Sequence, residues 1–165
     1  MTNKTLVYLG LGANLNSPIE QLRNATNALR DERDITLIAS SSLYASKPMG
    51  PQDQPDYINS VVAIETQLTP LQLLDITQKI ELDFGRVRKE DRWGARTLDI
   101  DILLFGTQTI ENERLTIPHY GMKVREFVLY PLQEIAPELI LPCGTNLANL
   151  ITTIDKNDLS IISAS

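Results

Sequence analysis

The apolar residues follow two different periodicities, which alternate from one segment of the chain to the next. In some stretches the apolar residues alternate or run together, as in strands, and in others they recur every three or four residues, as in amphipathic helices. The helical spacing covers 19–29 and 73–84. The strand-like stretches are 5–13, 35–45, 57–68 and 99–105. The predicted order is strand, helix, strand, strand, helix, strand, which is the split unit of ferredoxin-like α+β folds.

Short motifs indicate where these elements begin and end. Ser17-Pro18-Ile19-Glu20 and Thr69-Pro70-Leu71-Gln72 each have the spacing of a capping box, with proline at the first helical position. Gly85 ends the second helix, and a proline-rich loop over 47–56 joins the second and third strands.

Beyond Gly106 the pattern predicts additional C-terminal elements. They are a further strand over 109–117, a short helix near 125–132 and a helix around 147–154. At 165 residues, the chain has the length of one ordinary domain with a single core. We therefore expect one domain over 1–165, with a ferredoxin-like β-α-β-β-α-β core and a mainly antiparallel sheet.

Composition narrows the class of protein. The formal net charge is -6, which argues against general nucleic-acid binding and against an anionic membrane surface. Cys143 is alone, so the chain has no internal disulfide framework or thiolate metal site. No signal-peptide pattern and no apolar stretch of spanning length are present, so we expect a soluble, cytoplasmic protein. We separately expect a monomer.

The charge is unevenly distributed. Five cations lie between Gly85 and Arg96 against Glu90 and Asp91, a net charge of +3, which leaves -9 for the rest of the chain. A basic island on an acidic protein suits a compact polyanion such as the phosphates of a nucleotide. A solvated charged loop is the alternative.

Asp99 and Asp101 lie two residues apart on a predicted strand and therefore share one face, about 6.5–7 Å apart. The residues predicted to lie on the opposite face are Leu98, Ile100, Ile102 and Leu104. Carboxylates on a buried strand need cations, and hard oxygen ligands favour magnesium. Two solvated aspartates on a half-exposed strand are the alternative.

Several common catalytic motifs are absent from the sequence. Gly10-Leu11-Gly12 begins like a dinucleotide fingerprint, but Leu15 stands where the third glycine belongs. There is no P-loop and no nucleophile elbow, and a single His119 cannot form a multi-histidine metal site. Carboxylates for metal and arginines for phosphate remain, a combination that suits phosphoryl transfer with a nucleophile supplied by the substrate.

A second candidate feature follows the proline-rich loop. Tyr57 and Asn59 share a strand face, where one can stack on a flat ring and the other can read the polar edge of that ring. Ordinary strand residues beside a rigid surface loop are the alternative.

These residues carry a resemblance to a known family. The run R-W-G-A-R-T-L-D-I-D-I-L, residues 92–103, resembles the signature of the 6-hydroxymethyl-7,8-dihydropterin pyrophosphokinases, enzymes of folate biosynthesis. The similarity extends over most of the chain. Other matching segments are 12–15, 44–50, 54–59, 78–88, 118–120 and 125–127.

The resemblance implies that ATP donates a diphosphoryl group to the hydroxymethyl of the dihydropterin and leaves as AMP. It also implies two magnesium ions held by Asp99 and Asp101, and catalytic assistance from Arg86 and Arg96. The residues implied to hold ATP are Gln78, Glu81, Arg88, Arg114, Thr116, His119, Tyr120 and Arg125. The residues implied to hold the pterin are Ser46, Tyr57, Asn59, Trp93 and Phe127.

Some positions depart from the family pattern. Ser46 stands where threonine is common, Ala95 stands where proline is frequent, and Lys47 could place a charge near the pterin. We expect these changes to alter affinities and not the reaction. We also expect the basic segment 85–96 to be mobile when empty and to close once both substrates are bound.

Two rival functions use some of the same residues. A two-metal nuclease or nucleotidyl transferase would explain Asp99 and Asp101, but not the pocket at Tyr57 and Asn59. A non-catalytic ferredoxin-like module that binds nucleotide or RNA would need exposed aromatic residues and a basic face. Aromatic residues make up only 5% of this acidic chain, which disfavours that module.

Overall fold

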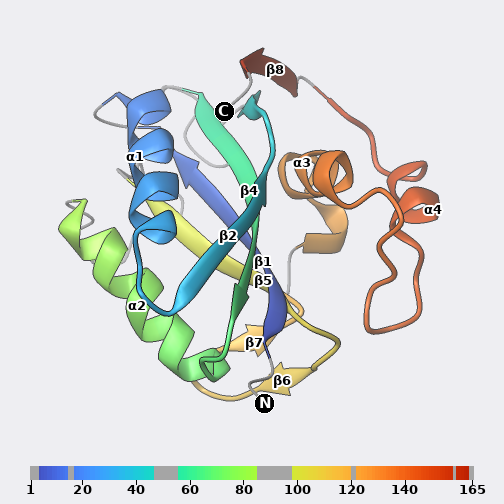
Figure 1. Cartoon of the computed structure of the whole chain (residues 1–165). Coiled ribbons are helices and arrows are strands. Elements are labelled where there is room, and N and C mark those ends of the chain that lie inside the picture. Colours follow the sequence, from blue (N-terminus) through green and yellow to red (C-terminus); the bar gives the residue numbers. More distant parts are fainter. Residues whose placement is uncertain are drawn as a thin grey trace.

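One antiparallel sheet lies between two layers of helices in the computed structural model (Figure 1). The structure describes residues 4–14, 17–46, 56–84, 98–119, 122–157 and 159–163. The helices are α1 (Pro18–Arg30), α2 (Pro70–Asp83), α3 (Glu126–Ile135), α4 (Leu147–Ile151) and the 3-10 helix η1 (Met122–Val124). The strands are β1 (Thr5–Ala13), β2 (Ile35–Ser40), β3 (Leu43–Ser46), β4 (Tyr57–Thr66), β5 (Asp99–Phe105), β6 (Ile110–Glu111), β7 (Thr116–Ile117) and β8 (Ser160–Ser163).

The strand order confirms the predicted split unit. β1 lies between β5 and β4, and both pairs are antiparallel. β4 pairs on its other side with β2 and then with β3, while β8 extends the sheet beyond β3. The predicted α+β class and mainly antiparallel sheet are therefore confirmed.

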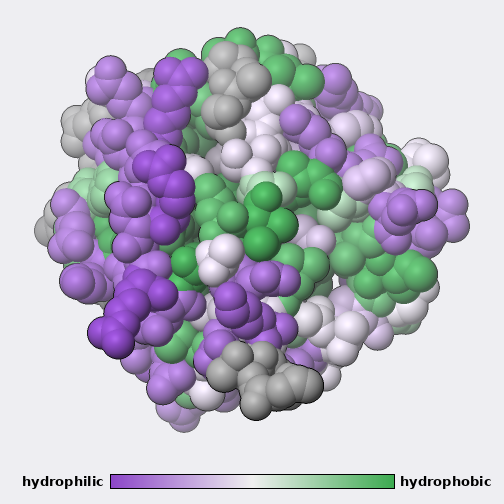
Figure 2. Space-filling view, viewed as in Figure 1, coloured by the Kyte–Doolittle hydropathy of each residue, from purple (hydrophilic) through white to green (hydrophobic). Residues whose placement is uncertain are grey.

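Each face of the sheet has its own apolar cluster. On the face covered by α1 and α2, the core includes Val7, Leu9, Leu11, Leu22, Leu29 and Leu73. On the face covered by α3 and α4, it includes Tyr8, Val61, Leu129, Leu132 and Leu147. The outer surface of α1 is hydrophilic, whereas apolar side chains gather over β2, where Ile38 is exposed (Figure 2). No helix in the described ranges is long and apolar enough to cross a bilayer.

The predicted strand over 35–45 is in fact two strands. Between β2 and β3, Ser41 bonds to β4 twice, donating its N–H to Val61 O (2.8 Å) and accepting from Val61 N at Oγ (2.9 Å). The next N–H, of Ser42, donates to the Glu134 carboxylate on α3 (3.0 Å). Tyr44 OH donates to the same carboxylate (2.7 Å). The pKa of Tyr44 is raised, mainly by burial of its hydroxyl and also by this hydrogen bond. Apart from the Ser41–Val61 backbone bond, hydrogen bonds to side chains therefore replace the strand ladder at the junction.

Two further predictions about elements are wrong in detail. The predicted strand over 109–117 is the hairpin β6–β7, because Asn112 Oδ1 accepts from Arg114 N and Leu115 N (both 2.9 Å) and turns the chain. The last predicted helix ends at Ile151, and the short strand β8 was not predicted.

The face assignment of Leu104 is also wrong. Tyr8 pairs with Leu104 but Leu9 pairs with Ile102, so β5 contains one extra residue at this point. Such a β-bulge changes which face the following side chains occupy. Leu104 therefore packs with Tyr8 on the α3/α4 face, whereas Ile100 and Ile102 pack on the α1/α2 face as predicted.

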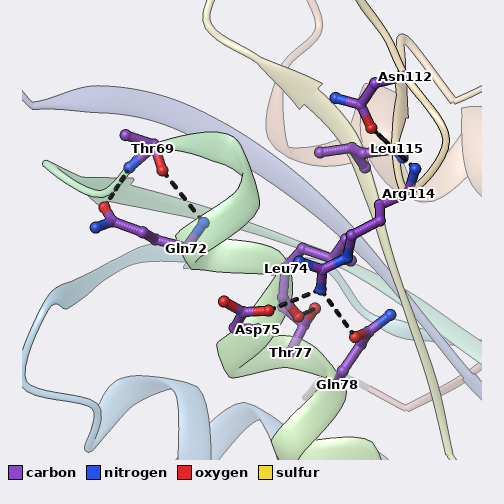
Figure 3. A network of polar contacts seen from close by, with 9 residues as sticks. All are labelled: Thr69, Gln72, Leu74, Asp75, Thr77, Gln78, Asn112, Arg114 and Leu115. Atoms are coloured by element: carbon purple, nitrogen blue, oxygen red, sulfur yellow. Dashed lines mark hydrogen bonds and ion pairs between the residues drawn. The ribbon is translucent and has the colours of Figure 1, made fainter.

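The two predicted capping boxes have different outcomes. At α2, Thr69 Oγ1 accepts from Gln72 N (3.2 Å), and Gln72 Oε1 accepts from Thr69 N (3.0 Å; Figure 3). At α1, Ser17 has left-handed backbone angles and its side chain makes no capping bond. An N-cap side chain reaches the first turn from an extended backbone, so the conformation of Ser17 prevents the predicted box.

We expect Thr69→Ala to lower the free energy of unfolding by about 1 kcal/mol, because it removes a formed cap. Ser17→Ala is the matched control and should change that free energy by less than about 0.5 kcal/mol. Urea denaturation of both variants measures the difference. Equal losses would mean that the Thr69 cap contributes nothing specific.

Candidate active site

A cavity of about 550 Å³ brings the predicted site residues together. Its walls come from β1, the end of β3, β4, β5, the hairpin β6–β7, α2 and the start of α3. All predicted site residues in the described part of the chain line it: Ser46, Tyr57, Asn59, Gln78, Glu81, Asp99, Asp101, Arg114, Thr116, His119, Arg125 and Phe127. Residues that the sequence placed in several unrelated segments therefore share one site.

Five predicted site residues lie outside the described residues. They are Arg86, Arg88, Trp93, Arg96 and Tyr120. The expected closure of 85–96 and the effects of Lys47 and Ala95 also concern positions outside the described ranges.

Asp99 and Asp101 line the cavity from β5. They pair with Gly12 and Gly10 of β1, and the Asp101 side chain is 38% exposed. Among the described residues, no group of three or more His, Cys, Asp or Glu side chains could hold a metal by itself. Two carboxylates in an open cavity fit Mg²⁺, which is commonly bound by one or two carboxylates, water and substrate phosphates.

His119 lies beside this carboxylate pair. Its Nε2 is 3.7 Å from Asp101 Oδ2, and its backbone N–H donates to Leu103 O (3.0 Å). The pKa of His119 is lowered to about 4, mainly because the imidazole is buried and also because the positive charge of Arg125 is near. The negative charge of Asp99 acts in the opposite direction and raises this pKa, but it does not outweigh the other two effects. The imidazole is therefore neutral near pH 7, and its contact with Asp101 is not an ion pair.

The predicted pterin residues lie on β3, β4 and the first turn of α3. Asn59 is buried and its Nδ2 donates to Ser46 Oγ (2.8 Å), so the serine orients the carboxamide. Tyr57 is the strand partner of Ser46. At the start of α3, the Arg125 guanidinium carbon lies 5.8 Å from the centre of the Phe127 ring, within cation–π range. Two aromatic rings and an oriented amide can bind a flat, polar-edged ring.

A polar cluster at the hairpin end of the cavity includes one residue that the sequence did not single out. Arg114 Nη2 donates to Asp75 Oδ1 (2.7 Å) and to Gln78 Oε1 (3.3 Å; Figure 3). Both side chains of the Arg114–Asp75 pair are substantially exposed, and such pairs contribute little stability. Asp75 therefore orients the guanidinium more than it stabilises the fold. Helical spacing alone marks Asp75 only as a solvent-facing position.

Glu81 has a backbone partner inside the protein. It is buried on α2, and its Oε2 accepts from Ile100 N (2.7 Å). Only alternate residues of a strand bond to a given neighbour, and β5 pairs with β1 alone among the described strands. The N–H of Ile100, between Asp99 and Asp101, therefore points away from β1 and would have no strand partner in the described part of the sheet. Glu81 accepts its hydrogen bond and thereby attaches β5 to α2.

We expect Glu81→Ala to lower the free energy of unfolding by about 1–3 kcal/mol, because it leaves the buried Ile100 N–H without an acceptor. Glu81→Gln retains an oxygen acceptor and should cost clearly less. Equilibrium denaturation distinguishes the two variants. If both destabilise equally, the carboxylate charge and not the hydrogen bond is what matters.

Known proteins with similar sequences identify the family to which this chain belongs. The family model of 7,8-dihydro-6-hydroxymethylpterin-pyrophosphokinase matches residues 8–137. The 2-amino-4-hydroxy-6-hydroxymethyldihydropteridine pyrophosphokinase of Haemophilus influenzae is 56% identical, over 87% of this chain and 89% of that relative. The proteins of the same name from Pseudomonas aeruginosa and Bacillus subtilis are 52% and 43% identical, over 88% and 81% of this chain and 89% and 80% of those relatives.

Solved structures agree at the level of the fold. HPPK-DHPS of Plasmodium falciparum aligns with a TM-score of 0.74 at 16% identity, over 92% of this chain and 42% of that chain. The present chain thus spans less than half of that longer protein. The family match over most of the chain and the high identity to relatives of one name show that this chain belongs to the 7,8-dihydro-6-hydroxymethylpterin-pyrophosphokinase family.

Proposed function

We propose that this pyrophosphokinase transfers the β,γ-diphosphoryl group of ATP to the hydroxymethyl oxygen of 6-hydroxymethyl-7,8-dihydropterin. The hydroxyl oxygen forms a bond to the β-phosphorus and loses its proton, the bond between this phosphorus and the α,β-bridging oxygen breaks, and AMP leaves. The observation that carries the proposal is that one cavity contains both a carboxylate pair and an aromatic pocket with an oriented amide.

Asp99 and Asp101 are the proposed ligands of two magnesium ions. When bound, Mg²⁺ neutralises phosphate charge and orients the transferring group. The cationic Arg125, which also lines the cavity, supports the same stabilisation. Neutral His119 adds a hydrogen-bonding group beside the carboxylates without cancelling their charge.

The remaining proposed contacts divide between the two substrates. Tyr57 and Phe127 stack on the pterin, while Asn59 and Ser46 bind its polar edge. The described residues proposed to hold ATP are Gln78, Glu81, Arg114, Thr116, His119 and Arg125. For Arg86, Arg88, Arg96, Tyr120 and Trp93 the proposed roles come from the resemblance alone.

The proposal includes the setting of the enzyme. We propose one pyrophosphokinase domain over 1–165 that acts as a cytoplasmic monomer on small-molecule substrates, without a nucleic-acid or membrane partner. The acidic net charge supports the absence of nucleic-acid binding.

Purified protein incubated with ATP, Mg²⁺ and 6-hydroxymethyl-7,8-dihydropterin should release AMP and form the pterin diphosphate. AMP should not appear when the pterin is omitted. A nuclease or nucleotidyl transferase would instead release pyrophosphate or cleave nucleic acid independently of pterin, and a binding module would form no product. Either outcome would reject the proposed reaction.

A further inference from the structure

Two residues of β1 that line the cavity have no side chain. Gly10 and Gly12 both line the cavity on β1. Gly12 is paired with Asn59 on β4 and with Asp99 on β5. Directly paired residues on neighbouring strands present their side chains on the same face. Gly12 therefore lies between Asn59, whose amide is proposed to bind the pterin, and Asp99, a proposed metal ligand.

The backbone at these positions does not require glycine. Both lie within a regular strand, and neither has a φ angle in the left-handed region. Glycine inside a strand weakens it and often marks a place where a ligand approaches the backbone closely. The reason for glycine at these positions must therefore be sought in the space around them.

That space differs sharply between the two positions. A Cβ on Gly12 would lie 3.2 Å from Asn59 Oδ1, closer than ordinary carbon–oxygen contacts. A Cβ on Gly10 would lie 3.4–3.6 Å from the side chain of Leu103, which is normal van der Waals contact. Only Gly12 is thus sterically coupled to a proposed substrate-binding group.

Asn59 has little freedom to move away from a new methyl group. It is 5% exposed, and its Nδ2 already donates to Ser46 Oγ at 2.8 Å. A shift of a few tenths of an ångström, or a rotation of the amide, would weaken that bond and redirect Oδ1. Because hydrogen bonds depend on direction, a ligand read by this amide would lose affinity.

We infer that Gly12 is a specificity-determining position for the pterin. Its missing side chain keeps the Asn59 carboxamide in the orientation set by Ser46, and it leaves room between Asn59 and Asp99 for the substrate. This inference rests on the proposed function, because it takes the ring read by Asn59 to be the pterin.

The test compares Gly12→Ala with Gly10→Ala, two identical changes on the same face of one strand. Calorimetric titration measures the pterin and ATP dissociation constants separately. Gly12→Ala should weaken pterin binding about three- to tenfold, the scale of one lost hydrogen bond, and change the ATP constant by less than about twofold. Gly10→Ala should leave the pterin constant within about twofold.

Three controls make the result decisive. Thermal unfolding should show that Gly12→Ala still unfolds in one cooperative transition with a midpoint near that of the parent, because the restriction of the unfolded chain by alanine offsets part of the crowding against Asn59. In an Asn59→Ala background, Gly12→Ala should cause no further loss of pterin affinity, because the amide through which it acts is gone. A further loss of equal size, or an unchanged pterin constant in Gly12→Ala alone, would overturn the inference. If the parent protein itself binds no pterin, the proposed function fails instead.

Discussion

Replacement of Asp99 or Asp101 by asparagine is expected to lower turnover by about a hundredfold or more. Asparagine keeps the shape of the side chain but removes the negative charge proposed to hold magnesium. Metal stabilisation of a developing phosphate charge contributes several kcal/mol, and each 1.36 kcal/mol corresponds to about tenfold in rate. Both aspartates are only partly buried, so we expect little effect on folding.

Initial rates of pterin-dependent AMP formation over a range of Mg²⁺ concentrations measure this effect. Asp31→Asn provides a matched control, because Asp31 is an exposed aspartate paired with Arg30 (3.6 Å) and does not line the cavity. That variant should retain the parental rate. Near-normal turnover of both Asp99→Asn and Asp101→Asn at low Mg²⁺ would reject the assignment of these residues as ligands.

Tyr57→Ala is expected to weaken pterin binding about ten- to hundredfold while leaving ATP binding nearly intact. Stacking of a base on an aromatic side chain contributes about 1–3 kcal/mol in nucleic-acid sites, and a pterin offers a similar flat ring. Tyr57 lines the cavity and is the strand partner of Ser46, which bonds to Asn59, whereas Arg114 bonds to Asp75 and Gln78 of α2, so the loss of Tyr57 should affect one substrate only.

Tyr57→Phe keeps the ring and serves as the control, with an expected pterin affinity close to that of the parent. Equilibrium titration with each substrate alone gives the two dissociation constants. A comparable loss of both affinities in Tyr57→Ala would show that Tyr57 supports the structure of the cavity and does not stack on the pterin.

The gap between prediction and structure is largest where side chains replace backbone contacts. Apolar periodicity predicted a single strand over 35–45, because the three serines at its centre, residues 40–42, are not a turn signal such as glycine or proline. The division into β2 and β3 depends on the Glu134 carboxylate, which is supplied by α3 from far along the chain. Likewise, the failed cap at Ser17 has the same local signature as the formed cap at Thr69.

The sequence by itself determined the architecture and the chemical class of the site. The periods of two and of three to four residues specify the order of strands and helices, because they reflect which side of each element is buried. The R-W-G-A-R-T-L-D-I-D-I-L run indicated the reaction through the family resemblance that it carries, and the same resemblance supplied the residues proposed for the site.

Only the tertiary structure decided how these residues act on one another. It shows that Glu81 supports β5, that Asp75 orients Arg114, and that Gly12 lies between Asn59 and Asp99. Each of these relations joins elements that are separated in sequence, and each depends on how those elements lie against one another. Periodicity and motifs describe neighbours along the chain, whereas strand register and helix packing determine the contacts between elements.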